Sequence, residues 1–422
     1  ALFRAERPLP QRNPRMSDPD QPILVVGGGI IGAACAYYLA EAGERVVVMD
    51  QAEFGSQCSL HNCGYVCPSH VLPLTEPGAV WATLKGMLRP NSPFSVKLRP
   101  DWRLAQWFLR FALRCNEKDM MTGARALYPL LRSSMNLYRE MLAREGIDCE
   151  WTDKGLLYVY ADRQAFESFS ETNDMLTEKF GETAKRIEGK DLKDVEPALK
   201  DGLAGGWHYL EDAHLRSDLL MSELNRVLLN KGVEILENRS FTGLRETESG
   251  LVAKTSEGDV AASHLVLATG ALTPKLSGIV GWRAPIEPGK GYSMTMQRPE
   301  TCPDLPLIFP ETRVAVTPFD EGYRLGSTME FSGYDDSINP KRLNLLRSGV
   351  EAFLREPYGE PVTNTWYGWR PMTYDSVPII GACPGNPRVT LATGHNMLGL
   401  SLAPATGKLV AELLTGRKPH IE

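Results

Sequence analysis

The sequence contains no apolar run of the roughly 18 residues that cross a bilayer, which argues against a membrane-spanning protein. Only 8 of its 422 residues are cysteines, and their scatter excludes a disulfide framework. Its 46 basic and 52 acidic residues leave a net charge of −6, which excludes a general nucleic-acid binder. No internal repeat is present. With 43% apolar residues, these absences predict a globular, cytoplasmic protein of two or three domains.

The first twenty residues form a separate stretch. Residues 1–20 carry charges and prolines but no apolar core of the kind found in a secretory signal. We expect them to be a disordered extension that takes no part in the fold.

A nucleotide-binding pattern follows directly. Residues 23–28 are an apolar run of strand-forming residues, and residues 27–32 fit the pattern G-x-G-x-x-G. A helix is expected over 33–42, and then a second buried strand that ends at Asp50. The glycines allow a pyrophosphate to approach the free N–H groups of the helix N-terminus, and Asp50 stands where a ribose hydroxyl needs an acceptor. The residues expected to contact an adenine dinucleotide here are Gly27, Gly29, Ile30, Ile31, Gly32, Asp50 and Gln51.

This pattern is compatible with either NAD or FAD as the bound cofactor. Three later segments favour FAD. They are the loop 55–64, the strand and turn 263–270, and the stretch 369–381 with its continuation 392–407. Together they resemble the D-amino-acid-oxidase superfamily of flavoproteins, and the resemblance extends over roughly residues 22–418. It implies an FAD-dependent oxidation of amines.

Within the superfamily, the resemblance is strongest to the bacterial D-amino acid dehydrogenases. They share Lys-Gly-Tyr-Ser at 290–293, Gly-x-Arg-Pro at 368–371 and Thr-Gly-His-x-x-x-Gly at 393–399. A helix that starts at the end of the last motif would point its N-terminus at flavin N1 and O2, where negative charge develops on reduction. The further residues expected at the cofactor are Ser59, His61, Asn62, Cys63, Gly64, Thr269, Gly270, Gly394, His395, Asn396, Met397, Leu398 and Gly399.

The expected fold class is α/β (α+β), because strand–helix units are interrupted by inserted segments. A Rossmann-like FAD-binding domain of the glutathione-reductase type is expected over 21–66, 203–270 and 367–418. A substrate domain, formed by 67–202 and 271–366, is expected to place an antiparallel sheet and helices over the flavin.

Flavin amine oxidation needs a clamp for the substrate, and no general base is obligatory because hydride can leave from a neutral amine. Arg370 and Tyr292 are the candidates for a carboxylate clamp. Arg370 could instead brace the flavin turn, and Tyr292 could instead pack in the core. His395 either polarises the substrate and supports flavin O2, or braces its own turn.

Many D-amino acid dehydrogenases have an arginine where this chain has Pro318, so either the clamp or the substrate differs here.

Other residues near the flavin loop also have two interpretations. In dimethylglycine dehydrogenase-like relatives, a histidine at the place of His61 is bonded covalently to the flavin; the alternative for His61 is packing against the ring. Lys290 is either a cation near flavin N5 or a salt-bridged lysine. Cys58, Cys63 and Cys67 have no fourth ligand nearby, so no metal is expected.

Residues 71–115 are basic in an acidic protein, with seven basic and two acidic residues. Arg103, Arg110 and Arg114 share a helical face opposite Trp107. This segment is either a peripheral contact with the anionic inner membrane and a quinone or redox partner, or an ordinary amphipathic helix with a solvated basic face.

We therefore expect an FAD-dependent enzyme that oxidises the C–N bond of a D-amino acid, or of a cyclic or N-substituted relative such as a D-proline or hydroxyproline. Electrons would pass to a quinone or another carrier. Two alternatives stay open: an oxidase of the glycine or sarcosine type that releases hydrogen peroxide, and a non-catalytic flavoprotein such as an assembly factor.

Overall fold

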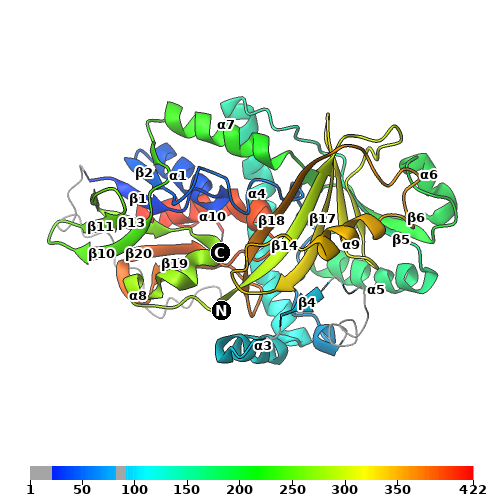
Figure 1. Cartoon of the computed structure of the whole chain (residues 1–422), viewed down its shortest axis with the longest axis horizontal. Coiled ribbons are helices and arrows are strands. Elements are labelled where there is room, and N and C mark those ends of the chain that lie inside the picture. The colour runs from blue at the N-terminus through cyan, green and yellow to red at the C-terminus, as the bar shows by residue number, and fades with distance from the viewer. Residues whose placement is uncertain (1–20, 82–91, 93, 98, 422) are drawn as a thin grey trace.

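The computed structural model describes residues 21–81, 92, 94–97 and 99–421. The expected extension 1–20 lies outside the described residues, as do Lys85 and Arg89 of the basic segment. Figure 1 shows two sheets side by side, with the first and last segments of the chain in the left half and the long strands β14, β17 and β18 in the right half.

The left half is built around a six-stranded sheet with the strand order β19-β20-β13-β1-β2-β9. All residues of β1 and β2 are buried, as expected for parallel strands that are covered on both faces. The strands run parallel except β19, which is antiparallel to β20. Helix α1 packs against α7 and α10, and α10 also packs against α4. The bounds are β1 (Ile23–Val26), α1 (Ile30–Glu41), β2 (Val46–Met49), α4 (Glu117–Glu145), α7 (Ser217–Asn230), β9 (Glu234–Leu236), β13 (His264–Leu267), β19 (Ile379–Cys383), β20 (Asn386–Thr393) and α10 (Gly399–Leu414).

The right half contains a nine-stranded sheet with the order β18-β14-β17-β16-β15-β5-β7-β6, and β4 pairs with β17. Its strands are antiparallel except for the pairs β15–β5 and β17–β4. Helix α9 packs on β14 and β17, and α5 packs on β5 and β7. The bounds are β4 (Phe94–Val96), β5 (Leu156–Tyr160), α5 (Arg163–Phe180), β6 (Lys185–Glu188), β7 (Gly205–Tyr209), β14 (Ile286–Met296), β15 (Leu307–Phe309), β16 (Val314–Pro318), β17 (Tyr323–Phe331), α9 (Pro340–Ser348) and β18 (Val362–Thr373).

Smaller elements connect and flank the two sheets. A two-stranded ribbon of β3 and β8 and a three-stranded sheet β10-β11-β12 accompany the six-stranded sheet. Their bounds, and those of the remaining helices, are β3 (Tyr65–Val66), α3 (Trp102–Arg114), η1 (Gly189–Asp191), α6 (Leu192–Val195), β8 (Ala213–His214), β10 (Phe241–Glu246), β11 (Leu251–Thr255), β12 (Val260–Ala262), η2 (Gly270–Leu276) and α8 (Ser277–Val280).

The structure confirms the expected α/β class, with a Rossmann-like sheet assembled from segments far apart in the sequence. Strand β7 lies inside the range 203–270, which was expected to belong to the nucleotide-binding domain, yet it pairs with β5 and β6 of the nine-stranded sheet. The division of the chain into domains stays a prediction.

Candidate functional site

A cavity of about 460 Å³ is lined by residues of both sheets. Its walls combine the carboxyl ends of β1, β2 and β13 with the loop 55–64 and with residues of β14, β16 and β18. Two of the expected site residues, Gly32 and Gly394, do not line it. The expected residues that do are Gly27, Gly29, Ile30, Ile31, Asp50, Gln51, Ser59, His61, Asn62, Cys63, Gly64, Thr269, Gly270, Tyr292, Arg370, His395, Asn396, Met397, Leu398 and Gly399.

The glycine motif brings helix α1 tightly against β1. Gly27 has φ +110°, and a Cβ atom on Gly32 would lie 1.8 Å from the Gly27 carbonyl oxygen. Gly32 thus serves the close packing of helix and strand rather than the cavity wall. At the N-terminus of α1, the Ile30 N–H donates to Ser59 Oγ, and no acidic residue lies in the first turn. This end of the helix suits an anion.

Asp50 ends β2 at the cavity wall. Its Oδ2 accepts from the Gly28 N–H at 2.6 Å, and its Oδ1 accepts from the Ala52 N–H at 2.9 Å. Burial raises the pKa of the carboxyl, while these backbone donors lower it. The acid is held at the edge of the sheet, where a ribose hydroxyl would need an acceptor.

The N-terminus of α10 faces the same cavity and has neither a side-chain cap nor an acid in its first turn. His395 just before it is buried, and its Nε2 lies 3.0 Å from Thr406 Oγ1. Burial lowers the pKa of His395 to about 3, so the ring is neutral. Asn396 adopts φ +53° and accepts from the Thr373 N–H. These contacts favour His395 and Asn396 as braces of the turn that presents α10.

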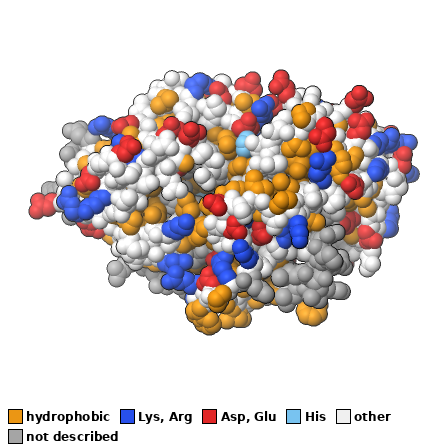
Figure 2. Space-filling model, viewed as in Figure 1, with side chains coloured by type: hydrophobic (Ala, Val, Ile, Leu, Met, Phe, Trp, Pro, Cys, Tyr) orange, Lys and Arg blue, Asp and Glu red, His pale blue; other side chains and the backbone are white. Residues whose placement is uncertain are grey.

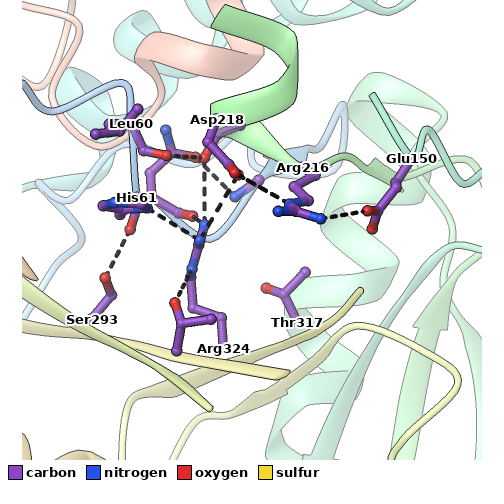
Figure 3. A network of polar contacts seen from close by, with 12 residues as sticks. Leu60, His61, Glu150, Arg216, Asp218, Ser293, Thr317 and Arg324 are labelled. Atoms are coloured by element: carbon purple, nitrogen blue, oxygen red, sulfur yellow. Dashed lines mark hydrogen bonds and ion pairs between the residues drawn. The ribbon is translucent and has the colours of Figure 1, made fainter. Parts of the chain in front are cut away.

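The loop 58–64 is fixed to the nine-stranded sheet by Arg324 of β17, a residue that we did not select from the sequence. Arg324 donates from Nη1 to the Asn62 carbonyl at 2.8 Å, and its Nη2 lies 3.3 Å from His61 Nδ1. On the other side, Ser293 Oγ donates to the His61 carbonyl at 2.8 Å. Figure 3 shows the contacts of Arg324 with the loop beneath Asp218, and Ser293 reaching His61 separately. Burial and Arg324 both lower the pKa of His61, so its ring is neutral.

Arg370 lies on β18 in the cavity wall and is only partly exposed. Its Nη1 donates to the Thr328 carbonyl at 2.7 Å and lies 3.8 Å from Met329 Sδ. No carboxylate among the described residues pairs with it. Burial lowers the pKa of the guanidinium, because it removes solvent from the charged form. Within the described part of the chain, the site therefore holds a cation without a carboxylate partner.

Tyr292 also contributes to the cavity wall, but its surroundings favour the core-packing alternative over a clamp. It stands on β14 between Gly291 and Ser293, and side chains alternate between the two faces of a strand. Its ring packs in the apolar cluster, and its hydroxyl donates to Glu330 Oε2 at 2.5 Å. The hydroxyl is thus already engaged by Glu330. Lys290 is likewise buried, lies 3.8 Å from Asp335 Oδ1 and does not line the cavity, so its salt-bridged interpretation holds.

A third histidine in the cavity wall, beside His61 and His395, was not selected from the sequence. His70 follows the β3 strand, and its Nε2 lies 2.7 Å from the hydroxyl of Tyr158 on β5. A lone histidine in a loop carries no periodic signal, so its place could not be inferred without the fold. Only the proximity of His70 to the glycine-containing loop hinted at it.

The cavity fits a flavin adenine dinucleotide. A Cβ atom on Gly27 would lie 2.5 Å from the Ala268 carbonyl oxygen, so the phosphate-binding turn tolerates no side chain there. Two helix N-termini without acidic first-turn residues, those of α1 and α10, contribute to its wall. Within the described residues, no group of histidines, cysteines or acids could hold a metal ion.

Comparisons with known proteins agree with this site. The sequence profile of the DAO family, described as FAD dependent oxidoreductase, matches residues 22–413. The chain is 31% identical over 411 residues to a D-amino acid dehydrogenase of Methylobacterium nodulans, covering 94% of this chain and 96% of that one. It is 29% identical over 408 residues to a D-amino acid dehydrogenase of Granulibacter bethesdensis, covering 95% and 97%.

Solved structures show the same fold. The glycine oxidase of Bacillus cereus superposes with a TM-score of 0.75 at 21% identity, covering 95% of this chain and 97% of that one. The L-proline dehydrogenase of P. horikoshii superposes with a TM-score of 0.69 at 20% identity, covering 94% of each chain. From the match over nearly its whole length, the chain belongs to the DAO family of FAD-dependent oxidoreductases.

Proposed function

We propose that this chain oxidises the Cα–N bond of a D-amino acid, or of a cyclic or N-substituted relative, and passes the electrons to a quinone or another carrier. The observation that carries the proposal is Arg370, a partly buried guanidinium in the cavity that contacts a carbonyl and a thioether and that no carboxylate of the described residues pairs with. Such a cation is stabilised when a carboxylate binds it. The two relatives named as D-amino acid dehydrogenases support the choice of substrate.

The chain's own residues orient and shield the substrate. Arg370 would hold the carboxylate through the nitrogen atoms that Thr328 leaves free. His395 and His61 are neutral, so neither adds a positive charge that would repel a substrate amine. Bound FAD supplies the acceptor for the hydride that leaves the substrate Cα. The uncapped N-terminus of α10 would stabilise negative charge at the pyrimidine edge of the cofactor. The imine product hydrolyses in water.

The test is anaerobic flavin reduction, followed near 450 nm, with D- and L-amino acids, sarcosine and dimethylglycine. We expect D-amino acids to bleach the flavin and Arg370→Met to lower the ratio of rate constant to Kd about 100-fold or more. Arg370→Lys keeps the positive charge but loses the planar guanidinium that can bind both carboxylate oxygens. The ratio of rate constant to Kd in this variant should therefore lie between those of the native enzyme and Arg370→Met. If dithionite alone reduces the flavin, the proposal fails. Hydrogen peroxide released in step with turnover would instead support the oxidase.

His61 is the residue through which a covalent bond to the flavin would form. Arg324 already donates toward Nδ1, so the ring proton belongs on Nε2, and Nε2 would form the bond after losing that proton. The new bond would replace the Nε2–H of His61 and one C–H of the flavin methyl group, and the two electrons released would go to the ring system and then to the acceptor. The contact between Arg324 and Nδ1 would survive the reaction.

Peripheral membrane contact would involve α3. Leu104 and Trp107 are buried on its inner face, whereas Trp102, Leu109 and Leu113 are 77%, 59% and 69% exposed on its outer face. Figure 2 shows apolar side chains gathered at the lower edge of the molecule, where Figure 1 places α3.

The outer face of α3 is basic as well as apolar. Arg103, Arg110 and Arg114 are exposed among its apolar side chains, a combination that suits an anionic bilayer. None of the helices among the described residues has the length and apolar character needed to cross a membrane. We therefore propose that the enzyme rests on the cytoplasmic side of the inner membrane, where a quinone is available.

A further inference from the structure

The cavity contains a second polar group, His70, that the proposed function leaves without a role. The ring of His70 is held by Tyr158 on β5, whereas Arg370 belongs to β18. Strands β14, β17, β16 and β15 lie between β18 and β5 in the sheet. Arg370 and His70 therefore line the cavity at separate places along the sheet that forms one of its walls.

The direction of the hydrogen bond follows from the surroundings of Tyr158. Burial raises the pKa of this phenol well above its usual range, so the hydroxyl keeps its proton. Among the described residues, its only hydrogen-bond partner is His70 Nε2, at 2.7 Å. A buried hydroxyl is satisfied when its O–H donates, so Tyr158 donates to Nε2. Burial also lowers the pKa of His70 to about 4, so the neutral ring carries its single proton on Nδ1.

The Nδ1 atom of His70 remains available to a ligand. It has no hydrogen-bond partner within the described part of the chain, and it is not one of the fully enclosed polar atoms. Ile308, which is paired with Tyr158 in the sheet, and Ala315, which is paired with Ile308, also line the cavity and are apolar. The hydroxyl of Tyr65 is already engaged, 2.7 Å from the Val316 carbonyl. This part of the cavity therefore offers an N–H donor in apolar surroundings.

We propose that His70 is a specificity-determining residue, whose Nδ1–H donates a hydrogen bond to an oxygen atom on the side chain or ring of the amino-acid substrate. The inference rests on the proposed function, because it takes the substrate carboxylate to lie at Arg370. The preferred substrates are then amino or cyclic imino acids with a hydroxyl, carbonyl or carboxylate oxygen beyond Cα. A purely aliphatic side chain would leave the donor unpaired, which lowers specificity for that substrate about 10-fold or more.

The test compares substrates that differ by a single oxygen atom: cis-4-hydroxy-D-proline with D-proline, and D-threonine with D-2-aminobutyrate. Anaerobic flavin reduction gives the rate constant and Kd for each. The native enzyme should prefer the oxygenated member of at least one pair about 10-fold or more. His70→Leu should bring that ratio close to one by weakening the oxygenated substrate. His70→Asn, whose amide N–H can replace the Nδ1–H donor, should keep part of the preference. Tyr158→Phe removes the hydroxyl that holds the His70 proton on Nδ1, so it should lower the preference.

The outcomes separate two failures. If amino acids reduce the flavin but the preference is absent, or is equal in native enzyme and His70→Leu, the role of His70 is refuted while the proposed function stands. If no amino acid reduces a flavin that dithionite reduces, the proposed function fails and the role of His70 fails with it. A second readout is the rise in melting temperature that the oxygenated substrate causes under nitrogen, which should shrink in His70→Leu. Should His70→Leu not fold, His70→Asn and Tyr158→Phe decide the question.

Discussion

The guanidinium of Arg370 packs so closely over Gly291 that a Cβ atom on Gly291 would lie 2.3 Å from Arg370 Cζ. The two residues stand on the paired strands β18 and β14, where Arg370 is opposite Gly289. The missing side chain at Gly291 thus sets the position of the one cation that we assign to the substrate.

We therefore expect Gly291→Ala to displace Arg370 and to raise the Kd of the substrate about 10- to 100-fold, with the flavin still bound. Stopped-flow reduction measures the change. Gly278→Ala is the matched control, because a Cβ atom there meets nothing within 4 Å. Unchanged substrate affinity in Gly291→Ala would contradict the assignment of Arg370.

Replacing Arg324 tests the link between the flavin loop and the nine-stranded sheet. Arg324→Met removes donors to the Asn62 carbonyl and His61 Nδ1 and leaves buried acceptors unpaired, so we expect a loss of at least about 2 kcal/mol in unfolding free energy and a lower flavin content. Arg324→Lys should be intermediate. Urea denaturation and flavin absorbance measure both effects, with the exposed Arg226→Met as the control.

A covalent flavin would be visible after denaturation. We expect the denatured native chain to keep yellow fluorescence on a gel and to carry the mass of one FAD, and His61→Gln to lose both while still binding flavin when folded. Loss of all flavin from the denatured native chain would show that His61 only packs against the ring.

The outer face of α3 should bind anionic vesicles. We expect the native protein to sediment with vesicles of phosphatidylglycerol and phosphatidylcholine, less so at high salt, because the arginines are screened. The double variant Trp102→Ser, Leu109→Ser should stay in the supernatant. Leu229→Ser, which removes a leucine that is 55% exposed on α7, should behave as the native chain. Equal sedimentation of all three would refute the membrane contact.

The buried acid Asp212 makes stability depend on pH. Its carboxylate accepts from the Ser69 N–H and hydroxyl, but burial dominates and raises its pKa from 3.8 to about 7. The folded state therefore keeps a proton that the unfolded chain releases, and its stabilising contribution is full below about pH 4 and is lost as pH rises to about 7. Relative to Asp212→Asn, the native chain should lose on the order of 3 kcal/mol across that window, measured by urea denaturation. Parallel pH curves for the two proteins would contradict the raised pKa.

The cofactor half of the site was predictable because its chemistry is local. The turn at 27–32, Asp50 and the motif at 393–399 each lie in a short segment with its own signal. Of the site residues selected from them, all except Gly32 and Gly394 line the cavity. The roles of these residues toward FAD stay predictions. The sequence also predicted the buried face of α3 correctly, since Trp107 is buried and Arg103 is exposed.

The substrate half was not predictable in the same way. Tyr292 was chosen from a motif, but whether a strand residue faces the cavity or the core depends on register with β17 and β18, which no local pattern fixes. Arg324 and His70 act through contacts with residues far away in the sequence, His61 and Tyr158 respectively. Such pairs appear only when the sheets are assembled.

The strand order of the six-stranded sheet also has a consequence for synthesis of the chain. Strand β20, which lies beside β13, is translated more than a hundred residues after it, and α10 is later still. The nascent polypeptide therefore cannot complete its cofactor site until nearly all of this sequence has left the ribosome. A message that stops before residue 386 yields a product with the apolar edge of β13 unpaired, which invites aggregation and marks the product for proteolytic quality control.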